Sequence, residues 1–212
     1  MKLIVFEGLD GSGKTTLIQK VRKQLEKQGH EVITLQGLGS SSIGKPLRDI
    51  FLTNAQLKPL TRYLLSCANM FQIQEEMIKP YLNTNKIILI DRWLGSNFAY
   101  QVYPHIYPHN IDKNYQFFNC LNETIYKPHL TVYLKIEPQL GLQRKLNQKN
   151  HKLDVIECKS LTYFEIVREG YYRYLTHHQC GMKLILNGTT NIAKNIRTIM
   201  KYLGEIQNGN NY

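Results

Sequence analysis

A glycine-rich stretch near the start of the chain is the feature that most constrains its fold. Residues 8–15 read Gly-Leu-Asp-Gly-Ser-Gly-Lys-Thr and match the pattern G-x-x-x-x-G-K-[ST] in full. An apolar run, Leu3 to Phe6, precedes this stretch, and a helical pattern from Thr15 to Gln28 follows it. A strand, a glycine turn and a helix in this order are typical of a loop that holds phosphate groups.

Each residue type in this loop has a physical reason. Glycines let the backbone curl, so that successive N–H groups point at phosphate oxygens, and the start of the helix adds a favourable field for an anion. Lys14 places a positive charge near the β- and γ-phosphates, and the hydroxyl of Thr15 can ligate Mg²⁺. We therefore predict a site for ATP and Mg²⁺ formed by Gly8, Asp10, Gly11, Ser12, Gly13, Lys14, Thr15 and Thr16.

Short apolar runs alternate with helical patterns along the rest of the chain. Continuous runs such as Ile87 to Ile90 are typical of strands buried on both faces of a sheet. Strands are predicted at residues 3–6, 31–35, 86–91, 130–136 and 182–186. We expect a doubly wound α/β fold, in which helices cover both faces of a five-stranded parallel sheet and ligands bind at the carboxyl ends of the strands.

The helical patterns complete this prediction. Helices are expected at residues 15–28, 43–52, 59–81, 95–102, 113–126, 138–147, 160–177 and 191–203, with a frayed polar tail from Gly204. Residues 1–212 are expected to form one domain, with a short lid around residues 144–157.

Asp91 and Arg92 follow directly on the third predicted strand, at the edge of the sheet where ligands bind. The carboxylate of Asp91 can hold Mg²⁺ through water, so Thr15 and Asp91 are the predicted metal residues. The guanidinium of Arg92 can bridge the transferred phosphate or the phosphate of an acceptor.

The chain has a formal net charge of +11 at pH 7, which could serve nucleic acids or small phosphorylated ligands. It contains no run of five basic residues and no nucleic-acid-binding signature. We therefore expect small-molecule nucleotides as partners and no dedicated nucleic-acid binding. The four cysteines form no C-x-x-C pair, and no signal peptide or membrane-spanning stretch is evident, so we expect free thiols, no membrane contact and a cytoplasmic location.

Several stretches together resemble the thymidylate kinase family. Besides the phosphate loop, they are the run Asp91 to Gln101, the run Gly141 to Arg144, residues 154–157 and the run Val167 to Tyr171. The resemblance covers about residues 2–203. It implies a homodimeric nucleoside-monophosphate kinase that moves the γ-phosphate of ATP to dTMP.

The resemblance also implies roles for individual residues. Asp10 is expected to contact the acceptor sugar or a nearby arginine, and Arg144 to lie at the lid over ATP. Lys14, Arg92, Asp10 and Arg144 are thus the expected catalytic residues. The residues expected to contact the acceptor are Gln36, Arg48, Ser66, Met70, Arg92, Ser96, Asn97, Tyr100 and Gln101.

The sequence departs from the family pattern at the acceptor site. Gln36 stands where the family has an arginine, Ser66 where it has a stacking phenylalanine, and Met70 where it has an arginine that reads the base. Trp93 replaces the usual tyrosine or histidine, and the ring of Tyr63 or Phe71 could fill the space left at Ser66. Without compensation, these changes weaken dTMP binding by on the order of 100-fold. Two alternatives therefore stay open: a kinase of another nucleoside monophosphate, and a nucleotide-binding regulator without transfer activity.

Overall fold

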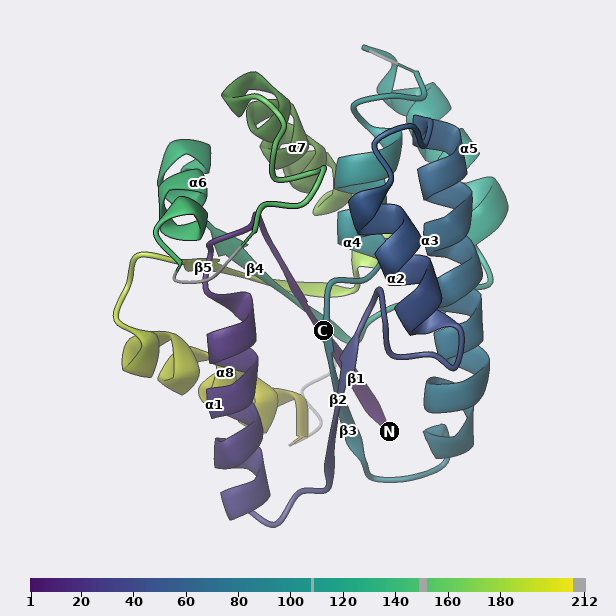
Figure 1. The fold of residues 1–212 in the computed structure, drawn as a ribbon. Helices are drawn as coiled ribbons and strands as arrows, with labels where there is room; N and C mark the ends of the chain where they lie inside the picture. The colour runs from purple at the N-terminus through teal and green to yellow at the C-terminus, as the bar shows by residue number, and fades with distance from the viewer. Residues whose placement is uncertain (108, 149–151, 208–212) are drawn as a thin grey trace.

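The computed structural model describes residues 1–107, 109–148 and 152–207. Five parallel strands form one sheet in the order β2-β3-β1-β4-β5 (Figure 1). The strands are β1 (Lys2–Glu7), β2 (Val32–Gln36), β3 (Ile87–Asp91), β4 (Leu130–Lys135) and β5 (Met182–Asn187). The predicted doubly wound α/β fold is confirmed.

The strand register brings the ends of three strands together. Phe6 on β1 and Gln36 on β2 both pair with Asp91 on β3. The residues that follow β1 and β3 therefore start from the same edge of the sheet, although about eighty positions separate them in the chain. This register places the phosphate loop beside Asp91 and Arg92.

Helices cover both faces of the sheet, and each face has its own apolar core (Figure 1). On one face α1 (Lys14–Lys27) and α8 (Ile192–Gln207) pack on alternate strand residues such as Ile4 and Leu89. On the other face α3 (Pro59–Ile73), α5 (Ile111–Asn122) and α7 (Leu161–Tyr174) pack on residues such as Val5 and Ile90. Burial on both faces explains why the central strands are continuous apolar runs.

The single long helix predicted at residues 59–81 is wrong in its second half. The α-helix ends at Ile73, a π-helical turn covers Gln74–Ile78 (η1), and a 3₁₀ turn covers Lys79–Tyr81 (η2). Pro80 accounts for this change, because it has no N–H to donate to the carbonyl of Glu76 as an α-helix requires. The widened turn instead lets Lys79 donate to the carbonyl of Gln74.

A second π-helical turn follows the third strand. The short helix α4 covers Leu94–Asn97, and the π-helical turn η3 covers Phe98–Val102, where the N–H of Tyr103 reaches back to the carbonyl of Phe98. All five residues of η3 are buried, so the wide turn presents successive side chains to the interior. Turns of this kind are frequent at functional sites.

Other helix ends differ from their predicted positions by a few residues. Helix α5 starts two residues early, because the side chain of Asn110 caps it by accepting from the N–H of Lys113, and it ends at Asn122. Helix α8 continues through the predicted tail to Gln207. The remaining elements are α2 (Gly44–Thr53), α6 (Pro138–Leu146) and the 3₁₀ turn η4 (His178–Cys180). In the described part of the chain, no helix has both the length and the apolarity needed to cross a bilayer.

Candidate nucleotide site

A cleft of about 690 Å³ lies at the carboxyl edge of the sheet. Its walls come from the phosphate loop, the ends of β2 and β3, helices α2, α3, α4 and α6, the turn η3 and the segment after α6. All nine residues predicted to contact the acceptor line this one cleft: Gln36, Arg48, Ser66, Met70, Arg92, Ser96, Asn97, Tyr100 and Gln101. The fold thus gathers residues from distant parts of the chain opposite Lys14 and Thr15.

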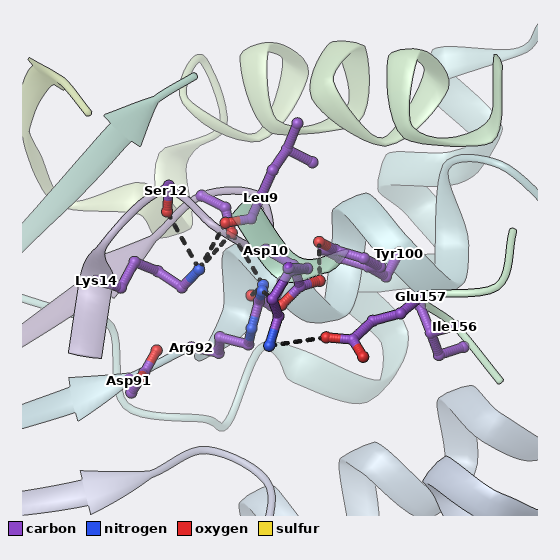
Figure 2. Close-up of polar contacts among 12 residues, drawn as sticks. Leu9, Asp10, Ser12, Lys14, Asp91, Arg92, Tyr100, Ile156 and Glu157 are labelled. Atoms are coloured by element: carbon purple, nitrogen blue, oxygen red, sulfur yellow. Dashed lines mark hydrogen bonds and ion pairs between the residues drawn. The ribbon is translucent and has the colours of Figure 1, made fainter. Parts of the chain in front are cut away.

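Lys14 lies inside the phosphate loop. Its Nζ donates to the carbonyls of Gly8 and Leu9, both at 2.9 Å, and to the hydroxyl of Ser12 at 3.4 Å (Figure 2). The residue is only 6% exposed, and burial lowers the pKa of its ammonium group to about 8. Lys14 therefore carries a positive charge that is poorly solvated and is held where a phosphate group could replace the lost water.

Backbone crowding makes glycine necessary in this loop. Gly11 has a φ of +74°, and a Cβ added there would lie 2.3 Å from the carbonyl oxygen of Gly141. Gly8 has a φ of +141°, and its added Cβ would lie 2.5 Å from the carbonyl oxygen of Leu134. Side chains at these positions would displace the loop, so the close approach of backbone groups depends on glycine.

Arg92 is held by contacts to its backbone and to its side chain. Its backbone has a φ of +67°, which is unusual for a residue other than glycine, and its N–H donates to the carbonyl of Phe6. Its guanidinium donates to the carboxylate of Asp10 at 2.7 Å and lies over the ring of Tyr100 at 5.1 Å. Further donors reach Gly8, Ser96 and Tyr171. These contacts fix a delocalised positive charge at the floor of the cleft.

Asp10 is the partner that holds Arg92 in place. Burial alone would raise the pKa of its carboxyl, but the charges of Arg92 and Lys14 lower it well below the usual range. The hydroxyl of Tyr100 donates to the second oxygen of Asp10 at 3.0 Å. Asp10 therefore stays ionised beside Arg92.

Thr15 and Asp91 lie together and fit a small divalent cation. The hydroxyl of Thr15 donates to Oδ2 of Asp91 at 2.8 Å. Oδ1 of Asp91 is buried and has no hydrogen-bond partner among the described residues. No group of three His, Cys, Asp or Glu side chains able to hold a metal occurs in the described ranges. One carboxylate and one hydroxyl suit Mg²⁺, which takes most of its remaining ligands from water and phosphate.

The acceptor side of the cleft carries an apolar patch among its polar residues. Met70 on α3 is 1% exposed, and the aromatic residues that line this side are Trp93, Tyr100 and Phe51. Neither Tyr63 nor Phe71 lines the cleft. Tyr63 instead lies in the core, where its hydroxyl accepts from Asn122 and its ring packs on Phe117. The idea that one of these two rings replaces the one absent at Ser66 is therefore wrong, because Tyr63 packs against α5 in the core and Phe71 does not reach the cleft.

One polar group on this side lacks a partner. Asn97 is 3% exposed, its Nδ2 donates to the sulfur of Cys67 at 3.4 Å, and its Oδ1 has no hydrogen-bond partner among the described residues. Arg48 on α2 donates to the carbonyl of Leu38 at 2.9 Å. Gln36, at the end of β2, lines the cleft without adding a charge. An amide oxygen and an arginine are thus available to an acceptor.

Arg144 belongs to α6 and touches the phosphate loop. Its guanidinium donates to the carbonyl of Gly11 at 3.1 Å and to the carbonyl of Gly188 at 3.2 Å. It therefore joins α6 to the loops after β1 and β5. Residues 149–151 of the predicted lid lie outside the described residues.

Comparison with known proteins assigns the family. A sequence model described as "Thymidylate kinase" matches residues 6–199. The thymidylate kinase of Kosmotoga olearia is 34% identical over 202 residues, which are 93% of each chain. That of Acholeplasma laidlawii is 34% identical over 174 residues, or 80% of this chain and 83% of its own. This chain belongs to the thymidylate kinase family. The family consists of nucleoside-monophosphate kinases that use ATP as the phosphate donor, which agrees with the loop geometry around Lys14.

Two buried residues of this family member were missed by the sequence reasoning. Glu7 is fully buried, and its carboxylate accepts from the N–H of Trp93 at 2.8 Å and from the hydroxyl of Ser96. Burial raises the pKa of Glu7, although these hydrogen bonds oppose the shift. The second residue is Tyr171, whose hydroxyl forms hydrogen bonds with both Arg92 and Ser96. An acidic residue inside an apolar strand was the available signal for Glu7, and the signal for Tyr171 was its place at the end of the run Val167 to Tyr171 that resembles the family.

Proposed function

We propose that this protein transfers the γ-phosphoryl group of ATP to dTMP, which yields ADP and dTDP. The observation that carries the proposal is the single cleft in which Lys14 and Thr15 face every residue expected to contact an acceptor. Phosphoryl transfer needs two anionic nucleotides in line and little covalent chemistry from the protein. A cleft with a phosphate loop on one side and a pocket of mixed polar and apolar side chains on the other suits this task.

The loop supplies the donor side. Its backbone N–H groups and the ammonium group of Lys14 bind the β- and γ-phosphates, with Ser12, Thr15 and Thr16 at the start of α1. Thr15 and Asp91 hold Mg²⁺, which when bound supplies positive charge to the phosphate oxygens. Because Lys14 is already desolvated, it loses little hydration when a phosphate arrives.

Arg92 supplies charge on the acceptor side. Asp10, Tyr100 and Tyr171 hold its guanidinium at the floor of the cleft, so its position costs no reorganisation during transfer. Arg48 on α2 also lines the cleft and can reach the acceptor phosphate. Asp10 keeps Arg92 oriented and can accept a hydrogen bond from the acceptor sugar.

The base is bound by packing and by one amide. Trp93, Phe51 and Met70 provide apolar contact in place of a stacked phenylalanine, and the Oδ1 of Asn97 can accept from an N–H on the base edge. Thymine carries such a group. These contacts support dTMP, whereas the neutral residues Gln36 and Ser66 favour a broader choice of acceptor.

A second copy of the chain is the proposed assembly partner, and the cytoplasm is the proposed location. Ile50, Leu60 and Leu64 on α2 and α3 are each between 45% and 47% exposed, which suits a buried interface between two copies. All four cysteines are free, in keeping with a reducing compartment. Sedimentation velocity of the wild type and of Leu64→Glu tests the dimer: a monomeric wild type contradicts it.

A panel assay tests the activity. Purified protein, ATP and Mg²⁺ are incubated separately with dTMP, dUMP, dCMP, dGMP, dAMP and the ribonucleotides, while ADP release is followed. A clear preference for dTMP supports the proposal, and turnover of another acceptor identifies a different specificity. No turnover with any acceptor, despite ATP binding, favours a regulatory role. The variant Lys14→Met serves as the control for contaminating kinases.

A further inference from the structure

The loop after β2 joins the two arginines of the acceptor side. The N–H of Gly37 donates to the carbonyl of Asp91 at 2.9 Å, and a Cβ added at Gly37 would lie 1.8 Å from the carbonyl oxygen of Arg92. The carbonyl of the next residue, Leu38, accepts from the guanidinium of Arg48 at 2.9 Å. The loop therefore fixes Arg48 relative to the strand end that carries Arg92.

One buried amide on α3 holds this loop at two points. Asn69 is fully buried, and its Nδ2 donates to the carbonyl of Gly37 at 2.7 Å. The hydroxyl of Ser41 donates to Oδ1 of Asn69 at 2.8 Å. Because a backbone carbonyl can only accept, the contact with Gly37 decides which end of the amide faces it. Both ends of the side chain of Asn69 are therefore committed to the same loop.

Asn69 lies outside the cleft whose wall it supports. Neither Asn69 nor Ser41 lines the cleft, whereas Ser66 and Met70 of the same helix do. Asparagine is a poor residue for the middle of an α-helix, and a buried amide needs partners for its donors and its acceptor. The loop after β2 supplies these partners. Asn69 therefore connects the helix that carries Ser66 and Met70 to the loop that joins the two arginines.

A second contact with the same loop lies nearer the surface. The carboxylate of Glu76 in η1 accepts from the N–H of Ser42 at 2.8 Å and from its hydroxyl. Glu76 is half-buried, so water can replace this contact when it is lost. Water has no such access to Asn69, which is fully buried. A change at Asn69 should therefore disturb the loop more than a change at Glu76.

We propose that Asn69 is a positioning residue for the acceptor phosphate, and that it acts through the loop after β2 on Arg48 and Arg92. This inference rests on the proposed kinase function, in which these two arginines bind that phosphate. A guanidinium binds phosphate through a planar fork, so its distance and angle matter. Loss of the contact from Asn69 leaves the carbonyl of Gly37 unpaired. The loop then shifts until water reaches this carbonyl, and the two arginines no longer fit one phosphate group.

Two ligands separate an effect on the phosphate from an effect on the base. Asn69→Ala should raise the Kd for dTMP about tenfold, which is the loss expected from one weakened charge-assisted hydrogen bond. The Kd for thymidine, which lacks the phosphate, and the Kd for ATP should both stay within twofold of the wild type. Displacement calorimetry measures all three constants. An equal loss for thymidine and dTMP means that Asn69 supports only the base side of the cleft, and overturns the positioning role.

Asn114 on α5 offers a matched control. It is also buried, its Nδ2 donates to the carbonyl of Tyr107 at 3.0 Å, and its Oδ1 accepts from the N–H of Tyr107 at 3.1 Å. Like Asn69, it does not line the cleft. Asn114→Ala should lower the melting temperature about as much as Asn69→Ala does, with all three Kd values within twofold. If Asn114→Ala weakens dTMP binding equally, the effect is one of stability alone and the role of Asn69 falls.

A milder variant keeps the test valid if Asn69→Ala does not fold. Ser41→Ala removes only the donor to Oδ1 of Asn69, and should raise the Kd for dTMP about threefold. In Asn69→Ala, the further change Ser41→Ala should have no additional effect, because Ser41 acts through Asn69. Effects that multiply contradict this chain of contacts, as does a Ser41→Ala protein that binds dTMP as tightly as the wild type.

The outcomes also separate this inference from the proposed function. If the wild type phosphorylates another acceptor faster than dTMP, the Kd values are measured with that acceptor and its nucleoside. If Asn69→Ala then has the expected effect, only the assignment of dTMP falls. If the wild type uses dTMP and Asn69→Ala binds it within twofold of the wild type, only the role of Asn69 falls. No turnover with any acceptor, together with no binding of any nucleoside monophosphate, overturns both.

Discussion

The donor and acceptor sides of the cleft are built in different ways. The donor side comes almost entirely from one continuous segment, in which Lys14 finds its partners five and six residues back along the chain. The acceptor side is assembled from β2, α2, α3, α4 and η3, and its loop is held by Asn69, whose Nδ2 donates to the carbonyl of Gly37 thirty-two residues away. Local geometry thus defines one side, and tertiary packing defines the other.

This difference explains where the sequence departs from its family. In the proposed function the donor side binds phosphate largely through backbone N–H groups, so its glycines and Lys14 cannot change without loss of the loop. The acceptor side binds through side chains from separate elements. Such a side can exchange an arginine for Met70 and let Phe51 and Trp93 supply the packing.

The largest effect is expected from a substitution on the donor side of the cleft. Lys14→Met should lower kcat/KM for ATP by roughly 1,000-fold or more, because the variant loses a fixed, desolvated charge beside the transferred phosphate. Steady-state kinetics measure the loss, and circular dichroism checks the fold. Lys20→Met, on the exposed face of α1, is the control. A loss of less than tenfold would place the donor phosphates elsewhere.

A smaller effect should damage the acceptor side alone. A Cβ added at Gly37 would lie 1.8 Å from the carbonyl oxygen of Arg92, so Gly37→Ala must shift the loop after β2. A displacement near 1 Å raises the KM for the acceptor by about 100-fold. Gly204→Ala, with open space around the added Cβ, should have no such effect. If the Kd for ATP, measured by calorimetry, rises as much as the acceptor KM, the two sides are not separable.

The affinity for ATP should depend on pH, because the donor side relies on the charge of Lys14. Burial gives Lys14 a pKa of about 8 in the free protein, and only its charged form attracts phosphate. As pH rises through 8, more of the free protein is neutral at Lys14, so the Kd for ATP should increase about tenfold between pH 7 and pH 9. Calorimetry in buffers of different ionisation enthalpy should detect uptake of about half a proton at pH 8. A flat profile over this range contradicts the shifted pKa.

The smallest effect concerns the base. Asn97→Ala removes the amide oxygen that has no partner among the described residues, and should raise the KM for the acceptor about two- to tenfold with the Kd for ATP unchanged. Asn119 also has a buried side-chain oxygen without a partner in the described part, but it does not line the cleft. Asn119→Ala is therefore the matched control. Equal KM values for both variants would show that Asn97 does not contact the base.

Much of the fold could be predicted because it is encoded locally. Buried strands such as Ile87 to Ile90 are continuous apolar runs. The loop of residues 8–15 needs backbone conformations that glycine adopts without strain, so its glycines mark it in the sequence. The helix after Pro59 was predicted too long, because a pattern of apolar spacing does not distinguish an α-helix from the wider turn that begins at Gln74.

Part of the candidate site could also be predicted from the sequence, and part could not. The sequence by itself determined the phosphate loop and the placement of Thr15 and Asp91 at one sheet edge, because these follow from motif spacing and parallel strand order. The residues expected around the acceptor came from the resemblance to the family. Only the tertiary structure decided that Tyr63 lies in the core, that Glu7 and Tyr171 support Arg92 and Ser96, and that Glu157 meets Lys145. Those contacts join residues far apart in the chain or across a turn, and their geometry depends on how whole helices pack on the sheet.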